Sequence, residues 1–205
     1  MATREDHWQD VYRSKGEADV SWFQQHPDLS LQLITSYAPA PARVIDIGGG
    51  ASRLVDELLA RGYQDVSVLD LSDEALKKSQ QRLGPAATKV HWIVADATQW
   101  QAERSYDLWH DRAAFHFLTQ DEQRSAYRER LLNALEMGGH AIIATFAPDG
   151  PERCSGLPIM RYSPQDLAQV LGPKLALVAS KTESHVTPWG AEQRFQYSVF
   201  KCLPD

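Results

Sequence analysis

From residue 43 onward, short apolar runs alternate with more polar, helix-like segments. The runs at 43–47, 66–70, 90–96, 106–111 and 140–146 have the length of strands rather than of helices. An alternation of strands and helices is typical of a parallel sheet that is covered by helices. The pattern therefore predicts an α/β fold with a doubly wound sheet.

The intervening segments carry apolar residues at helical spacing and mostly end at glycine. They predict helices over 54–62, 71–84, 121–139 and 163–172. Ser72 and Ser163 stand where a hydroxyl accepts a hydrogen bond from the first turn, so both are expected to cap their helices. The longest of these helices is expected to end at Gly138 and Gly139.

The two ends of the chain complete the architecture. Two β-rich stretches, 175–186 and 193–202, are joined by the turn-like segment TPWGAE, which suits an antiparallel hairpin at the sheet edge. Residues 1–37 are too aromatic for a solvated tail and are interpreted as helices packed over the sheet. We therefore expect residues 1–205 to form one domain, with a helical cover at 1–37 and an α/β core at 43–205.

Composition excludes several classes of protein. The 205 residues are 43% hydrophobic, enough for a core, yet the longest apolar runs are strand-sized and no membrane span is expected. The N-terminus lacks an apolar stretch, so a cytoplasmic protein is expected. Lys and Arg number 21 against 27 Asp and Glu, and no basic cluster exceeds Lys77–Lys78, which argues against a nucleic-acid partner. Cys154 and Cys202 are interpreted as free thiols.

Candidate chemistry lies at the ends of the first three strands. The first strand runs directly into DIGGGAS, which places Gly48, Gly49 and Gly50 at the carboxyl end of a buried strand, where open parallel sheets bind ligands. Asp70 ends the second strand and is placed to accept hydrogen bonds from the hydroxyls of a ribose. Asp96 ends the third and is placed to receive the exocyclic amine of an adenine. A purely structural tight turn is the alternative for the glycines taken alone.

Two common nucleotide motifs do not fit. The dinucleotide fingerprint requires a third glycine or alanine where this chain has Arg53, and no Lys followed by Ser or Thr comes after the glycines as in a phosphate-binding loop. What fits instead is a ligand with a ribose and an adenine but without a pyrophosphate.

These residues resemble the first motif of the class I S-adenosylmethionine-dependent methyltransferases, an acid followed by glycines at alternate positions. Asp46, Gly48 and Gly50 match it, and Ser52 replaces a frequent third glycine. The resemblance spans roughly residues 43–200 and implies a Rossmann-like, seven-stranded, mostly parallel sheet with an antiparallel last strand and helices on both faces. It also implies S-adenosylmethionine as cofactor.

The same resemblance assigns the parts of the cofactor to residues of this chain. It places the methionine part at Gly48, Gly49 and Gly50 near Asp46, the ribose at Asp70 with Leu71, the adenine at Asp96 with Ala97, and the methionine amino group near His110 and Asp111. Aromatic faces suit a sulfonium cation, so Tyr12 and Trp22 are candidate cofactor contacts. Packing in the core is the alternative for both rings.

Two further segments, WHDRAAFHFLT (109–119) and ATFAPDGPERCSGLP (144–158), resemble a small, mostly bacterial branch of the family. The branch is related to a mitochondrial enzyme that methylates a lysine of citrate synthase. This resemblance implies methyl transfer to a small-molecule acceptor, with a protein lysine as the alternative acceptor. A non-catalytic sensor that binds S-adenosylmethionine is the rival hypothesis from another class.

The acceptor is expected beside the end of the fourth strand. Asp111 or His116 would take a proton from an oxygen or nitrogen acceptor, with Arg112 as a third catalytic candidate and Phe115 as a substrate contact. A structural histidine is the alternative for His116, which lies among apolar residues.

The segment after the fifth strand has the composition of a lid. Phe146 and Arg153 are candidate substrate contacts there, and Arg153 would recognise an anionic acceptor. Cys154 would suit a soft metalloid or serve merely as a small side chain. No metal site is expected, because Asp149 and Glu152 lack a histidine partner in sequence.

Overall fold

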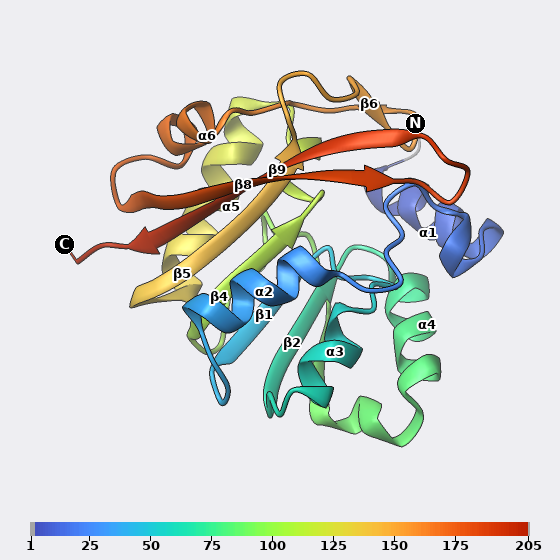
Figure 1. Ribbon diagram of the computed structural model, residues 1–205. Coiled ribbons are helices and arrows are strands. Elements are labelled where there is room, and N and C mark those ends of the chain that lie inside the picture. The colour runs from blue at the N-terminus through green and yellow to red at the C-terminus, as the bar shows by residue number, and fades with distance from the viewer. Residues whose placement is uncertain (1–2, 205) are drawn as a thin grey trace.

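A computed structural model describes residues 3–204 and places a twisted sheet at the centre of the molecule (Figure 1). Within these residues the sheet has seven strands in the order β3-β2-β1-β4-β5-β9-β8. The strands are β1 Arg43–Ile47, β2 Asp65–Asp70, β3 Val90–Val94, β4 Tyr106–Arg112, β5 Leu135–Phe146, β8 Leu175–Val186 and β9 Glu192–Cys202. The first five are parallel, and β9 runs antiparallel to both β5 and β8. The predicted fold class is confirmed.

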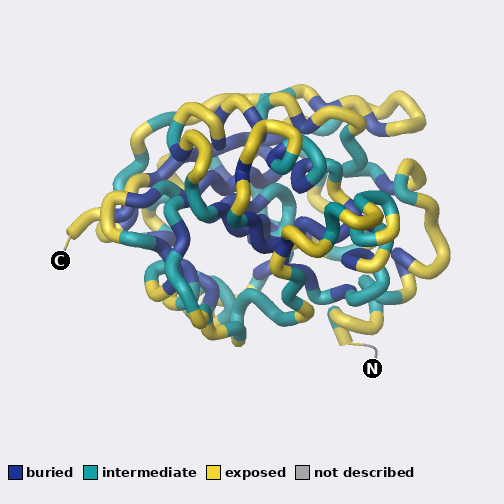
Figure 2. Tube along the Cα trace, turned by 90° about the horizontal axis from the view of Figure 1, so that it is seen from below, coloured by how far each residue is buried: buried dark blue, intermediate teal, exposed yellow. Residues whose placement is uncertain are grey.

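Helices cover both faces of the sheet. On one face, buried side chains of α2 (Asp28–Tyr37), α3 (Leu54–Ala60) and α4 (Asp73–Leu83) pack against alternate residues of the strands. On the other face lie α5 (Asp121–Ala134) and α6 (Pro164–Leu171). Figure 2 shows the buried residues gathered inside and the exposed ones on the outer turns. No helix among residues 3–204 is both long and apolar enough to cross a bilayer.

Local sequence explains where the helices begin. The hydroxyl of Ser72 accepts a hydrogen bond from the Ala75 amide at 3.1 Å, and Ser163 accepts one from the Asp166 amide at 3.1 Å. Each bond satisfies one of the free amides of a first helical turn. Both predicted caps are confirmed. Short 3-10 helices stand at η1 (Glu17–Asp19), η2 (Gly84–Lys89) and η3 (Phe115–Phe117).

The helix expected over 121–139 was predicted too long. It ends at Ala134, and Leu135 already has extended backbone and pairs with Tyr106 in the sheet. Gly138 has φ 81°, a conformation that no right-handed helix contains. The apolar spacing of the last helical turn continues into the strand, so periodicity alone did not locate the boundary.

The N-terminal cover divides into two parts. Helix α2 packs on the sheet as expected, whereas α1 (Arg4–Ser14) lies against α4 at the carboxyl ends of the parallel strands. Beside it, the expected irregular lid contains a small hairpin of β6 (Arg153–Cys154) and β7 (Leu157–Pro158). The His7 ring nitrogen lies 3.3 Å from the Ser155 hydroxyl at the hairpin turn. Helix α1 and the hairpin thus meet above the edge where the candidate site residues end.

Candidate cofactor and acceptor site

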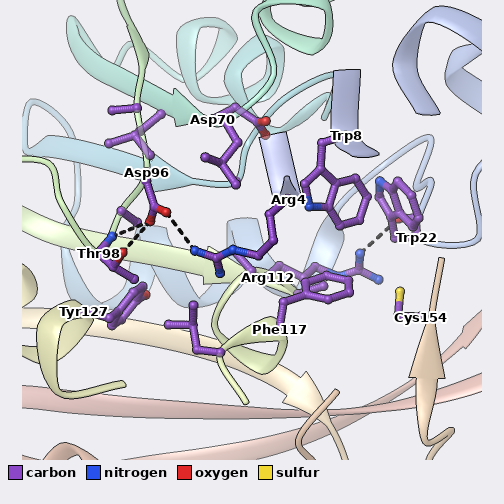
Figure 3. Close-up of a pocket in the computed structure, with 18 of the residues that line it drawn as sticks. Arg4, Trp8, Trp22, Asp70, Asp96, Thr98, Arg112, Phe117, Tyr127 and Cys154 are labelled. Carbon is purple, nitrogen blue, oxygen red and sulfur yellow. Dashed lines mark hydrogen bonds and ion pairs between the residues drawn. The ribbon is translucent and has the colours of Figure 1, made fainter. Parts of the chain in front are cut away.

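A cavity opens where β2, β3 and β4 end and α1 crosses above them (Figure 3). The sequence-predicted residues that line it are Tyr12, Trp22, Gly48, Asp70, Leu71, Asp96, Ala97 and Arg112. A second, adjoining cavity shares Tyr12, Trp22, Gly48 and Arg112 with the first and adds Asp46, Gly49 and His110. Most of the predicted cofactor contacts are therefore brought together at one edge of the sheet.

The glycine loop makes its turn in a space too small for side chains. Gly48 has φ 67°, and its amide donates to the Leu69 carbonyl at 2.7 Å. A Cβ atom on Gly49 would lie 2.5 Å from Asp46 Oδ2 and 2.7 Å from Val68 Cγ1. Both neighbours are buried, so neither has room to withdraw.

We expect Gly49→Ala to lower the free energy of unfolding by about 2 to 3 kcal/mol, because overpacking forces buried atoms apart. Gly62→Ala is the matched control. Gly62 has φ 87° with no atom near its missing Cβ, so alanine there carries backbone strain alone. Urea denaturation of both variants measures the difference, and equal losses would show that crowding at Gly49 is relieved in solution.

Asp70 forms the middle of the cavity wall. The residue is 7% exposed, and its Oδ1 accepts a hydrogen bond from the Ser72 amide at 2.8 Å. Burial raises the pKa of Asp70 to about 7; the hydrogen bond from Ser72 opposes that rise, and the nearby charge of Asp46 adds to it. A buried carboxylate gains from a ligand that brings hydroxyl groups, because each hydroxyl donates a hydrogen bond to the charged form. The two hydroxyls of a ribose are such donors.

Asp96 stands at the far end of the same wall and is already engaged. Its Oδ1 accepts from the Thr98 amide at 2.8 Å and the Thr98 hydroxyl at 2.7 Å, and its Oδ2 accepts from Arg4 Nη2 at 2.7 Å. Figure 3 shows Arg4 reaching across the cavity to this carboxylate. An adenine amine would therefore share Oδ2 with Arg4 or displace it.

Asp46 and His110 form a buried pair beneath the second cavity. Asp46 Oδ1 lies 2.7 Å from His110 Nδ1, and His110 Nε2 lies 2.9 Å from the Ser30 hydroxyl. All three residues are at most 3% exposed. The contact with the carboxylate fixes the orientation of the imidazole ring. His110, on β4, therefore holds the Asp46 side chain in place beside the glycine loop that follows β1.

At the end away from Asp96 the cavity becomes an aromatic chamber, lined by Trp8, Tyr12, Trp22, Arg112, Phe117 and Cys154. The Trp8 ring lies 5.0 Å from that of Phe117 and 5.5 Å from that of Trp22, both edge to face. These are favourable geometries for aromatic pairs, so the rings form a stable wall. The chamber offers flat apolar surfaces and one guanidinium.

Asp111, predicted as a catalytic residue, and Phe115, predicted as a substrate contact, are not among the residues of 3–204 that line either cavity. Asp111 is fully buried; its Oδ1 accepts from the Ala114 amide at 2.9 Å and its Oδ2 from the Tyr127 hydroxyl at 2.6 Å. Burial raises the pKa of Asp111 to about 6, against the opposing effect of these hydrogen bonds. Phe115 packs on Tyr127 and Tyr162 in the core. Neither side chain faces the chamber.

His116 and Phe146 are likewise core residues. The His116 ring packs against Phe117 and Phe146, and neither ring nitrogen has a hydrogen-bond partner among the described residues. Burial, with the charge of Arg112, lowers the pKa of His116 to about 3, so the ring is neutral. Arg153 is exposed and donates to the Gly156 carbonyl within its own hairpin. The geometry brings none of the three to the cavity.

Several lining residues were not anticipated from sequence: Arg4, Trp8, Thr98, Phe117, Leu118 and Tyr127. Thr98 had a detectable signal, since a hydroxyl two residues after a strand-ending aspartate often bonds to its side chain. Arg4 and Trp8 had none, because they come from a helix whose docking position no local pattern specifies. Within residues 3–204, no three His, Cys, Asp or Glu side chains gather as a metal-binding group would.

Comparisons with known proteins agree with this geometry. Residues 44–139 match the model of a family described as a methyltransferase domain. The chain has the fold of a solved N-methyltransferase NodS from Bradyrhizobium japonicum WM9 in complex with S-adenosyl-L-homocysteine. The TM-score is 0.70 at 16% identity, covering 97% of this chain and 99% of that one.

Curated relatives also have low sequence identity to this chain. An eEF1A lysine and N-terminal methyltransferase of Mus musculus is 24% identical over 149 residues, which is 69% of this chain but only 21% of the relative's length. A malonyl-[acyl-carrier protein] O-methyltransferase of Ilyobacter polytropus is 23% identical over 176 residues, 80% of this chain and 66% of the relative. The family match and the structural likeness support the prediction of a methyltransferase. Residues 44–139 thus match a methyltransferase-domain model, and the chain as a whole has the fold seen in solved S-adenosylmethionine-dependent methyltransferases.

Proposed function

We propose that this protein, acting as one domain over residues 1–205, transfers a methyl group from S-adenosylmethionine to a small-molecule acceptor. The observation that carries the proposal is the continuity of one cavity. Its wall runs from Asp96 past Asp70 and Gly48 into the aromatic chamber. A cofactor held at the strand ends would thus have its reactive end beside the aromatic chamber.

The residues present fit the cofactor. Asp70 offers a buried carboxylate for the ribose hydroxyls, and Leu71 and Ala97 offer apolar surface for an adenine beside Asp96. Gly48, Gly49 and the Asp46–His110 pair border the adjoining cavity, where the methionine part would lie. S-adenosylmethionine, when bound, supplies a methyl group on a sulfonium.

The protein's own task is then alignment and the exclusion of water. Helix α1 covers the cavity with Trp8 and Tyr12, and the Arg4–Asp96 ion pair at 2.7 Å holds the start of this helix against the end of β3. Tyr12 and Trp22 border both cavities, so their rings would meet the sulfonium. We assign Asp111 and His116 no proton transfer, because neither lines the cavity.

The acceptor class follows from the shape of the site. The chamber lies beneath α1 and the β6–β7 hairpin, which suits a small molecule better than the flank of a folded protein. The relative from Mus musculus is named for methylating a lysine and an N-terminus, and the finer resemblance noted above includes a lysine methyltransferase. A protein acceptor, in which one side chain enters the chamber, is therefore the alternative.

Incubation with methyl-labelled S-adenosylmethionine tests the proposal. The protein is mixed separately with the low-molecular-weight fraction and the protein fraction of a cell extract, and the labelled products are separated. We expect label in the small-molecule fraction. Asp70→Asn, assayed in parallel, should lose this transfer, because its ribose contact is weakened.

The other outcomes separate the alternatives. Label in the protein fraction alone would replace the small-molecule acceptor with a protein acceptor. Tight binding of S-adenosylhomocysteine by calorimetry, together with no transfer to either fraction, would favour the sensor hypothesis. Failure to bind S-adenosylhomocysteine would contradict the cofactor site itself.

A further inference from the structure

The guanidinium of Arg112 is buried at the wall of the aromatic chamber and is not fully used. Its Nε donates to the Tyr197 hydroxyl at 2.9 Å and its Nη1 to the Trp22 carbonyl at 3.0 Å. The Phe195 ring lies 4.2 Å from the guanidinium carbon. The side chain is only 10% exposed, so these contacts hold it in one position.

The remaining nitrogen, Nη2, has no hydrogen-bond partner among the described residues. It lies 3.5 Å from Glu183 Oε2, an ion pair too long for a good hydrogen bond. A buried guanidinium nitrogen without an acceptor is costly, and the cost is removed when an anionic oxygen binds there. Figure 3 shows the guanidinium between Trp22 and Cys154, beside the Phe117 ring.

The charges around the chamber favour an anion. The carboxylates that line the cavity are Asp70, which the proposed function assigns to the ribose, and Asp96, which is already paired with Arg4. Around the chamber itself, the described charged side chains are Arg112 and its partner Glu183, which also accepts from Gln24 at 3.0 Å. An ammonium group would meet the guanidinium without a free carboxylate to stabilise it.

The chamber also lacks a base. Its titratable groups, apart from Arg112, are Tyr12 and Cys154. Burial raises the pKa of the Cys154 thiol to about 11 and places the pKa of Tyr12 above its ordinary value, so both stay protonated at neutral pH. An acceptor atom that is already ionised and nucleophilic needs no base.

We infer that the methyl acceptor is a small organic acid whose carboxylate is held by the Arg112 guanidinium and whose flat apolar body lies against the wall formed by Trp8, Trp22 and Phe117. In the transfer, a carboxylate oxygen forms a bond to the methyl carbon as the bond from that carbon to the sulfonium breaks. The electron pair of the broken bond stays on sulfur, and the products are a methyl ester and S-adenosylhomocysteine. No proton moves. This inference rests on the proposed function.

The test uses phenylacetate and its uncharged counterpart phenylacetamide, titrated by calorimetry into the protein saturated with S-adenosylhomocysteine. Saturation is measured first, so failure of the cofactor site is recognised before the acceptor is tested. We expect phenylacetate to bind about tenfold more tightly than the amide or better, as a charge-assisted hydrogen bond provides. Equal binding of the two, or binding of neither, would overturn the inference.

Two variants locate the anion. Arg112→Gln should lower the affinity for phenylacetate about tenfold, which is more than it lowers the affinity for S-adenosylhomocysteine. Glu183→Gln removes the negative charge beside Nη2 and should raise the affinity for phenylacetate about threefold. A misfolded variant would not gain affinity. Arg194→Gln, at an exposed arginine paired with Asp149 at 2.6 Å, is the matched control and should change neither affinity.

The variants also separate the competing explanations. If Arg112→Gln lowers the affinity for S-adenosylhomocysteine but not for phenylacetate, the guanidinium holds the carboxylate of the cofactor and the inference is wrong. If Arg153→Gln has the effect expected of Arg112→Gln, the anion is held by the hairpin instead. With labelled cofactor, alkali-labile label on phenylacetate would support ester formation, whereas label on added polylysine alone would contradict it.

Discussion

Asp70→Asn is expected to weaken S-adenosylhomocysteine binding at least thirtyfold, or about 2 kcal/mol, measured by calorimetry at pH 8. The carboxylate lies in the cavity wall with one oxygen bound to the Ser72 amide. Hydroxyl groups of a ribose would donate to an ionised carboxylate more strongly than to an amide. An affinity within threefold of the parent would contradict the ribose assignment.

The same substitution should stabilise the protein without ligand. The pKa of Asp70 is raised to about 7 in the folded state, above the usual value of 3.8. Between about pH 4 and 7 the folded protein therefore binds a proton that the unfolded chain has lost, and this group's contribution to stability falls as the pH rises. Asp70→Asn should thus match the parent near pH 4 and exceed its free energy of unfolding by about 4 kcal/mol at pH 8, at about 1.4 kcal/mol for each unit of pKa difference.

Asp70→Asn should therefore weaken ligand binding while it raises the free energy of unfolding. This combination distinguishes a ligand-binding carboxylate from a structural one. A structural carboxylate would lose stability on conversion to the amide, and its pH dependence would be reversed. The parent's affinity for S-adenosylhomocysteine should also fall as the pH drops below about 7, because the carboxylate must then lose a proton to bind. Ser72→Ala, which removes a helix cap but no cavity contact, is a control for general destabilisation and should leave this pH dependence intact.

The sequence predicted the strands well because buried parallel strands are marked by both apolar runs and the breakers around them. The first strand agrees with β1, Arg43–Ile47, residue for residue, and the edge hairpin agrees with β8 and β9 to within one residue. The third strand, expected over 90–96, ends two residues early at Val94. The largest error falls where two elements share an apolar pattern. Residues 135–139 continue the helical spacing of α5, yet they belong to β5, since only tertiary pairing with β4 separates the two states.

The cofactor half of the site was more predictable than the acceptor half for a physical reason. Asp46, Gly48, Asp70 and Asp96 are fixed by where strands end, and strand ends are visible in sequence. The chamber, by contrast, is built by Trp8 from α1 and Cys154 from the β6–β7 hairpin, whose positions depend on long-range docking. Arg112 was anticipated because it follows the fourth predicted strand, whereas its ion pair with Glu183 was not.

Asp111→Ala is expected to lower the free energy of unfolding by about 3 kcal/mol, because it removes the acceptor of several buried donors. The carboxylate accepts from the Tyr127 hydroxyl and from the amides of Ala114 and Phe115. Trp109 donates to Tyr127 at 2.8 Å, so the loss extends into a second buried side chain. Urea denaturation measures the effect, and Asp121→Ala, at an exposed acid on α5, is the control.

Asp111→Asn separates this structural role from the proton transfer that the sequence suggested. The amide oxygen still accepts from the backbone, so most of the protein should stay folded and the turnover number for methyl transfer should remain within about fivefold of the parent. A general base contributes about a hundredfold or more, and a base with the pKa of about 6 held by Asp111 would make the rate rise through that pH. A parent profile that rises near pH 6 and becomes flat and slow in Asp111→Asn would therefore restore the catalytic role. A profile unchanged in shape would leave Asp111 as the buried acceptor that holds the start of η3 and the Tyr127 ring in place.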